Sequence, residues 1–161
     1  MAFVSIGSNL GDSKAIVLDA VGWLEGLSDE PILRSSLWQT SPLYCPPGSP
    51  EFVNAIVGLV PRPDETPESL LAKLLVLEKE FGRTPKKIPN EPRRLDLDLI
   101  AFGGRAKKTE TLILPHPRAH RRKFVLQPLS EIVPDLVLPG QEHTVAFLLA
   151  HLHTAEIVTK L

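Results

Sequence analysis

The chain of 161 residues is long enough for one domain with a substantial core, and 43% hydrophobic residues exclude a largely disordered protein. No apolar run reaches the roughly 18 residues that a membrane span requires, and the first residues lack the pattern of a secretory signal. The single cysteine, Cys45, excludes an internal disulfide and a cysteine metal cluster. We therefore predict one cytoplasmic domain, residues 1–161, without a membrane partner.

The net charge of −1 conceals a strongly basic segment. Residues 83–123 contain 12 of the 18 Lys and Arg residues but only 4 of the 19 Asp and Glu residues. Positive charge gathered in one part of a nearly neutral chain indicates an anionic ligand, although a solvated basic surface is the alternative.

The first part of the chain alternates strand and helix patterns. We predict strands over residues 2–9, 31–41 and 51–60, and an amphipathic helix over residues 10–28. Asp12 or Ser13 can cap this helix. The loop at residues 42–50 contains four prolines, so it cannot lie in the centre of a sheet.

The clearest helix pattern covers residues 66–82, where Thr66 can form the cap, Pro67 takes the first helical position and Gly82 ends the helix. A polar, proline-rich loop at residues 83–92 follows and could close over a site as a lid. Further along we predict a strand through Asp96 and Asp98, a small apolar turn at residues 124–134 and a short helix over residues 144–152. Because the connections between neighbouring strands are short, the sheet is mixed or antiparallel, and the fold belongs to the α+β class.

The stretch RRLDLDLI places Asp96 and Asp98 between leucines. In a strand both carboxylates lie on one face while the leucines face the core, whereas a helix would separate the two acids by roughly 200°. Adjacent carboxylates repel each other, and Mg²⁺ prefers oxygen ligands, so the pair suits a divalent metal. From these residues alone, a solvated acidic face of an amphipathic strand is the alternative.

Familiar phosphate-binding and hydrolytic motifs are absent. The stretch GSNLG does not continue as a P-loop, and neither GxGxxG nor GxSxG occurs. His116 and His120 have HxxxH spacing, but Pro117 argues against a zinc helix. What remains is a carboxylate pair with a basic loop before it and a His/Arg cluster after it, a combination that suits phosphoryl transfer.

Six stretches, in order, resemble the motifs of one family: IGSNLGD, TSPLY, FVNAIV, EKEFGR, PRRLDLDLI and LPHPRAHRRKFVLQPLSEI. The family is 6-hydroxymethyl-7,8-dihydropterin pyrophosphokinase of folate biosynthesis, and the resemblance covers nearly the whole chain. It implies a ferredoxin-like αβα sandwich with a mainly antiparallel sheet. It also implies transfer of pyrophosphate from ATP to the hydroxymethyl group of the dihydropterin, release of AMP, two Mg²⁺ ions, small-molecule substrates without nucleic acid, and a monomer.

The resemblance also assigns site residues. Asp96 and Asp98 would bind Mg²⁺, and Arg83 and Arg93 would be the catalytic arginines that stabilise charge on the transferred group. The implied ATP-binding residues are Glu78, Lys86, Leu99, Ile113, His116 and Arg122, and the implied pterin-binding residues are Thr40, Pro42, Leu43, Phe52, Asn54 and Phe124. Guanidinium groups suit phosphate oxygens, and aromatic faces suit a flat heterocycle.

The loop 83–92 departs from the family pattern, because Pro85 and Asn90 stand where relatives often carry a second arginine and a tryptophan. His120, Arg121 and Cys45 receive no role. Two other functions are alternatives: a nucleic-acid-binding module, suggested by the basic segment, and a regulatory domain that only binds a nucleotide. The low aromatic content of 6% argues against the first. The intact acids and arginines argue against the second.

Overall fold

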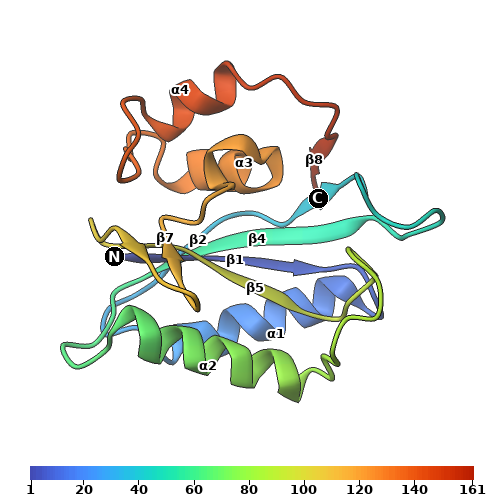
Figure 1. The fold of residues 1–161 in the computed structure, drawn as a ribbon, viewed down its shortest axis with the longest axis horizontal. Helices are drawn as coiled ribbons and strands as arrows, with labels where there is room; N and C mark the ends of the chain where they lie inside the picture. Colours follow the sequence, from blue (N-terminus) through green and yellow to red (C-terminus); the bar gives the residue numbers. More distant parts are fainter.

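The computed structural model describes residues 1–161 and has three layers, with a sheet between two pairs of helices (Figure 1). The strands are β1 (Ala2–Ser8), β2 (Leu33–Arg34), β3 (Trp38–Thr40), β4 (Phe52–Leu59), β5 (Asp96–Phe102) and β8 (Val158–Lys160). Their order is β5-β1-β4-β3-β8, β2 pairs with β4, and every pair is antiparallel. The predicted α+β class with a mainly antiparallel sheet is confirmed.

Helices cover both faces of the sheet. On one face lie α1 (Ser13–Glu25) and α2 (Pro67–Glu80), and on the other lie α3 (Lys123–Ile132) and α4 (Val145–Ala150) (Figure 1). Each face has its own hydrophobic core, of 20 buried residues under α1 and α2 and of 10 under α3 and α4. None of the helices has both the length and the apolar character needed to span a membrane.

Two small elements lie beside the sheet. A hairpin is formed by β6 (Lys107–Lys108) and β7 (Ile113–Leu114), which pair antiparallel. The short helix η1 (Ala119–Arg121) directly precedes α3.

The two helices of the first half begin where the sequence predicts. The Asp12 side chain accepts a hydrogen bond from the Ala15 backbone N–H at 3.2 Å and caps α1. Thr66 and Ser69 form a reciprocal capping box at the start of α2, with Pro67 at the first helical position. Gly82, at φ +87°, follows the last turn of α2, because a left-handed residue there favours glycine.

Three parts of the secondary structure differ from the prediction. Residues 31–41 form two short strands, β2 and β3, instead of one. Residues 123–132 form a helix of 10 residues, α3, where we predicted an apolar turn. The strand β8 near the end of the chain was not predicted at all.

Candidate active site

Three neighbouring strands form the floor of the site. Their register places Gly7 of β1 between Asp96 of β5 and Asn54 of β4. A Cβ on Gly7 would lie 2.9 Å from Asn54 Oδ1, so a larger residue at this position would displace the buried Asn54 side chain. Asp96 and Asp98 line one cavity while Leu97 between them is in the core, so both carboxylates lie on one face of the sheet.

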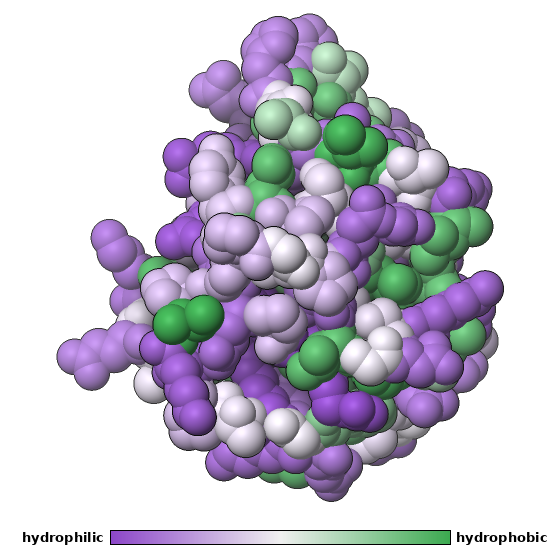
Figure 2. Space-filling view, turned by 90° about the vertical axis from the view of Figure 1, so that its right-hand side faces the viewer, coloured by the Kyte–Doolittle hydropathy of each residue, from purple (hydrophilic) through white to green (hydrophobic).

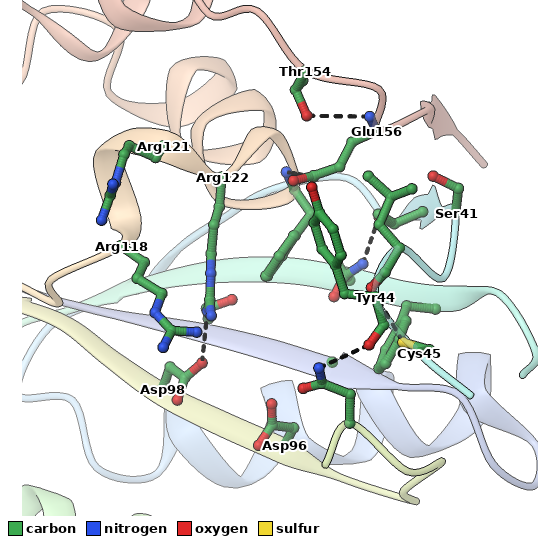
Figure 3. Close-up of a pocket in the computed structure, with 18 of the residues that line it drawn as sticks. Ser41, Tyr44, Cys45, Asp96, Asp98, Arg118, Arg121, Arg122, Thr154 and Glu156 are labelled. Atoms are coloured by element: carbon green, nitrogen blue, oxygen red, sulfur yellow. Dashed lines mark hydrogen bonds and ion pairs between the residues drawn. The ribbon is translucent and has the colours of Figure 1, made fainter.

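Arginines surround the two carboxylates. Arg83 Nη1 lies 2.6 Å from Asp96 Oδ1, and Arg93 Nη2 lies 3.2 Å from Asp96 Oδ2, so both oxygens of Asp96 are paired. Arg122 Nη1 lies 3.9 Å from Asp98 Oδ2 and reaches it from the opposite side of the cavity (Figure 3). The Nε of Arg93 is buried without a hydrogen-bond partner, an exception to the usual pairing of buried donors.

Glu78 of α2 contacts both this cluster and the backbone of β5. Its side chain is buried, and Oε1 accepts hydrogen bonds from the Leu97 backbone N–H at 2.8 Å and from Arg83 at 2.9 Å. Burial raises the pKa of Glu78 above its ordinary value. Glu78 thus fixes Arg83 against the start of β5.

The two aspartates have opposite pKa shifts. Burial by itself would raise the pKa of Asp96, but Arg93 and Arg83 hold it below its ordinary value. Burial, and then the charge of Asp96, raise the pKa of Asp98 to about 6. The negative charge of Asp98 is therefore poorly compensated, and a cation beside it would be stabilised.

His116 is electrically neutral near pH 7. Burial, followed by the charges of Arg122 and Arg118, lowers its pKa to about 4. Its backbone N–H donates to the Ile100 carbonyl at 2.8 Å, which ties the segment before η1 to β5.

Two cavities meet at Asp98, which lines both. The larger, of about 690 Å³, lies between the strands of the floor and the α3 side of the molecule (Figure 3). It brings together nine of the predicted residues: Thr40, Leu43, Phe52, Asn54, Arg93, Asp96, Asp98, Arg122 and Phe124. The smaller, of about 270 Å³, contains Leu99, Ile113 and His116.

Four predicted residues lie outside both cavities. Arg83 is paired with Asp96, and Glu78 is connected to this pair through Arg83. Lys86 is exposed in the loop 83–92, and Pro42 is half-buried without lining either cavity. The structure therefore gathers the acids and arginines but leaves Lys86 and Pro42 apart.

The large cavity has a polar and aromatic end away from Asp98. Asn54 is 3% exposed, and its Nδ2 donates to Thr40 Oγ1 at 2.6 Å. The guanidinium of Arg93 lies 5.4 Å from the ring centroid of Phe52, and that of Arg122 lies at the same distance from Phe124. These arginines therefore link the aromatic end to the carboxylates.

Sequence reasoning missed several residues of the site. Asn9, which is 2% exposed, donates to the Pro50 carbonyl and accepts from the Arg93 backbone N–H at 2.9 Å, so it ties together two loops at the site. Arg121 and Cys45, which the sequence assigned no role, line the large cavity. No local signal marks Asn9, because its partners lie far away in the chain.

The segment 153–156 also lines the large cavity, although it follows α4 by sequence. Glu156 accepts a hydrogen bond from the Phe124 backbone N–H at 3.1 Å and so caps α3. The face in Figure 2 is the end of the molecule toward which these loops converge, and hydrophilic side chains predominate on it.

Comparison with known proteins places the chain in a family. Residues 3–134 match the model of the 7,8-dihydro-6-hydroxymethylpterin-pyrophosphokinase (HPPK) family. The 2-amino-4-hydroxy-6-hydroxymethyldihydropteridine pyrophosphokinase of Synechocystis sp. is 38% identical over 89% of this chain and 72% of that protein. The protein of the same name from Methylorubrum extorquens is 35% identical over 87% of each chain.

Longer proteins also match. The folic acid synthesis protein fol1 of Pneumocystis carinii is 39% identical over 85% of this chain, which corresponds to only 18% of that relative's length. A crystal structure of HPPK-DHPS in complex with substrates aligns with a TM-score of 0.70 over 92% of this chain and 42% of that one. At 13% sequence identity, this last match shows a common fold alone.

Fold and site together define an α+β enzyme in which a carboxylate pair and several arginines meet at the junction of two cavities. Given the match over residues 3–134 and relatives of 35–38% identity over most of their length, the chain belongs to the HPPK family. The family resemblance in the sequence motifs is thereby confirmed.

Proposed function

We propose that this protein transfers pyrophosphate from ATP to the hydroxymethyl group of 6-hydroxymethyl-7,8-dihydropterin and releases AMP. The observation that carries the proposal is the position of Asp98 between two cavities, with Asp96 and three arginines beside it. A reaction that joins two substrates through a highly charged group needs this arrangement of two compartments around one charged junction.

The smaller cavity suits the nucleotide base and the larger one suits the acceptor. Leu99 and Ile113 give the smaller cavity an apolar wall, and His116 stays neutral there. In the larger cavity Phe52 and Phe124 offer aromatic faces, while the Asn54 carbonyl oxygen is an acceptor for the amino edge of a pterin. The polyphosphate would then lie across the junction.

Arg83 and Arg93 have two alternative partners in this proposal. Each is paired with one oxygen of Asp96 in the structure, so a cation that binds Asp96 has to share or displace these contacts. Released from Asp96, the guanidinium groups are free for phosphate oxygens, to which they can donate paired hydrogen bonds. The unpartnered Nε of Arg93 adds a donor that is already buried at this place.

Asp96 and Asp98 fit Mg²⁺ as ligands, and we assign two ions to them. No group of three or more acidic, histidine or cysteine side chains gathers here. Two carboxylates suffice for Mg²⁺, which keeps water molecules and takes the remaining oxygens from substrate phosphates. Bound Mg²⁺ would polarise the phosphate oxygens and offset their charge.

The core of the fold fits the ferredoxin-like αβα sandwich. Support comes from the element order β1-α1-β3-β4-α2-β5 and from a sheet in which β1 lies between β5 and β4, with β3 beyond β4. We regard α3, α4 and β8 as additions to this core.

The test is incubation with ATP, Mg²⁺ and 6-hydroxymethyl-7,8-dihydropterin, followed by chromatography of the nucleotides and mass spectrometry of the pterin. We expect AMP and a pterin diphosphate in equal amounts. ADP with a singly phosphorylated pterin would indicate an ordinary kinase. No pterin-dependent turnover, together with salt-sensitive binding of RNA or DNA, would favour the nucleic-acid-binding module instead.

A further inference from the structure

Asn9 is a buried polar residue beside the site, and the proposed function gives it no role. It lines neither cavity, so any effect of Asn9 on the reaction must pass through its neighbours. A buried side-chain amide costs free energy unless its donor and its acceptor are both paired. The partners of the Asn9 amide therefore indicate what this residue holds in place.

Two hydrogen bonds join Asn9 to Arg93. The Asn9 backbone N–H donates to the Arg93 carbonyl oxygen at 3.1 Å, and the Arg93 backbone N–H donates to Asn9 Oδ1 at 2.9 Å. The pairing of β1 with β5 ends at Gly7 and Asp96, so both bonds lie beyond the end of the strand ladder. Asn9 thus extends the attachment of β1 as far as the backbone of Arg93.

The other end of the Asn9 amide reaches the loop before β4. Nδ2 donates to the Pro50 carbonyl oxygen at 3.3 Å, across 41 residues of sequence. Pro50 is two positions before Phe52, the first residue of β4, and the Arg93 guanidinium lies 5.4 Å from the Phe52 ring centroid. The Asn9 amide therefore connects Arg93 to a second segment that the Arg93 side chain itself contacts.

The position of the Arg93 guanidinium depends on this support. Nη2 lies 3.2 Å from Asp96 Oδ2, and Nη1 donates to the Glu91 carbonyl oxygen at 3.2 Å. Residues 84–92 form no backbone–backbone hydrogen bonds, so the chain before Arg93 gives it little support. The two bonds from Asn9 fix the backbone from which the Arg93 side chain extends.

We propose that Asn9 is a positioning residue of the reaction: it holds the backbone of Arg93 so that the guanidinium meets the transferred group beside Asp96. The inference rests on the proposed function, because it takes Arg93 to stabilise charge on that group. Displacement of a catalytic group by about 1 Å can lower a rate by about 100-fold, so a contact that fixes its backbone affects kcat without touching a substrate.

The test measures AMP formation in single turnovers with excess enzyme, in a double-mutant cycle of Asn9→Ala and Arg93→Ala. Urea unfolding of each variant is measured in parallel. Asn9→Asp is the second variant, because it keeps an acceptor for the Arg93 N–H and loses the donor to Pro50. Ser35→Ala is the matched control: Ser35 is also buried, its Oγ accepts from the Ile56 backbone N–H at 2.9 Å, and it lines neither cavity.

We expect Asn9→Ala to lower the turnover rate by about 10- to 100-fold in the unmodified background and by less than about twofold in the Arg93→Ala background. The loss of stability should be similar in both backgrounds, because Arg93→Ala keeps the backbone groups that Asn9 binds. Asn9→Asp should retain more of the rate than Asn9→Ala. Ser35→Ala should lose stability and keep the rate of the unmodified chain.

Equal losses of rate in both backgrounds would overturn the inference and leave the proposed function intact, and so would a normal rate of Asn9→Ala. If Asn9→Ala does not fold, Asn9→Asp decides, because any loss of rate that it shows must also vanish in the Arg93→Ala background. No AMP formation by the unmodified chain would overturn the proposed function and this inference with it.

Discussion

At the scale of single residues, Asp98 carries a charge that its surroundings compensate poorly. Its pKa is raised to about 6 by burial and by Asp96, and its contact with Arg122, at 3.9 Å, is long. Asp96, by contrast, is held by two arginines at 2.6 and 3.2 Å. The two acids therefore differ in what they contribute to the folded state, although they share one face of a strand.

We expect Asp98→Asn to leave the free energy of unfolding unchanged or higher, because it removes repulsion from Asp96. The same change should lower kcat/KM at least about 100-fold if Asp98 binds Mg²⁺. Urea unfolding and AMP formation at saturating Mg²⁺ are the measurements. Asp64→Asn is the control, because this exposed side chain forms no hydrogen bond or ion pair. Normal activity of Asp98→Asn would contradict the metal assignment.

Asp98 and His116 should give opposite pH dependences of stability. The folded pKa of Asp98 is above its ordinary value of 3.8, so its contribution to stability falls as pH rises from about 4 to about 6. The folded pKa of His116 is below its ordinary value of 6.5, so the unfolded chain binds the proton more readily and stability rises from pH about 4 to about 6.5. In the unmodified protein the two effects oppose each other.

The single variants should separate these effects. Over this pH range we expect the urea midpoint of Asp98→Asn to rise more steeply with pH than that of the unmodified chain. The midpoint of His116→Asn should instead fall with rising pH when compared with the unmodified chain. The experiment is a set of unfolding curves between about pH 4 and pH 7 without divalent cations. Parallel pH profiles for the two variants would show that these groups do not titrate as described.

At the scale of elements, α3 depends on a residue far away in the chain. The residue before the helix is Arg122, whose side chain forms no cap hydrogen bond. The side chain of Glu156 instead accepts a hydrogen bond from the Phe124 backbone N–H. Because Arg122 and Phe124 both line the large cavity, the cap that orders the start of α3 also orders one wall of the site.

We expect Glu156→Ala to lower the free energy of unfolding by about 1 kcal/mol, the usual contribution of a helix cap. Glu156→Gln keeps an acceptor oxygen, so its free energy of unfolding should fall less than that of Glu156→Ala. Urea unfolding measures both, with Glu142→Ala as the control, because Glu142 is an exposed acid that forms no hydrogen bond or ion pair. Equal stability of Glu156→Ala and Glu142→Ala would mean that this hydrogen bond does not support α3.

Dependence on residues far away in the chain explains which elements the sequence predicts well and which it does not. Residues 66–82 carry their own cap, first-turn proline and terminal glycine, so local pattern is enough for α2. The segment 124–134 has a proline in its middle, at Pro128, and takes its cap from outside, so local pattern indicates a turn. The strand β8 has three residues and exists through its pairing with β3, which no local signal reveals.

The features of the site also fall into those that local sequence predicts and those that it does not. The alternation of Asp96 and Asp98 with leucines predicts one shared face, and the structure agrees. The family motifs lead to nine residues that do meet in one cavity. The double pairing of Asp96 by arginines, the role of Asn9 and the wall at residues 153–156 depend on side chains brought together by folding, so the sequence alone could not supply them.

At the scale of the whole molecule, charge is distributed unevenly along the chain. The segment 83–123 contributes the arginines of the cavity, while most of the acids belong to the rest of the molecule. A basic segment beside the cavity of a nearly neutral protein attracts an anion such as ATP over a distance of several ångströms, and salt screens this attraction.

We expect the KM for ATP to rise severalfold when ionic strength increases from about 0.05 M to about 0.3 M. The KM for the uncharged pterin should stay nearly constant, and it serves as the internal control. Steady-state kinetics at fixed Mg²⁺ measure both values. A parallel rise of the two would indicate a general effect of salt on the enzyme, without specific attraction of the nucleotide.

The central position of β1 has a consequence for synthesis of the chain on the ribosome. β1 is made before both of its neighbours in the sheet, β4 and β5, and all seven of its residues are buried. The second neighbour ends at Phe102, so until that residue has been synthesised β1 presents one edge without a partner. Such an edge is a place where two growing chains can pair with each other until β5 is available.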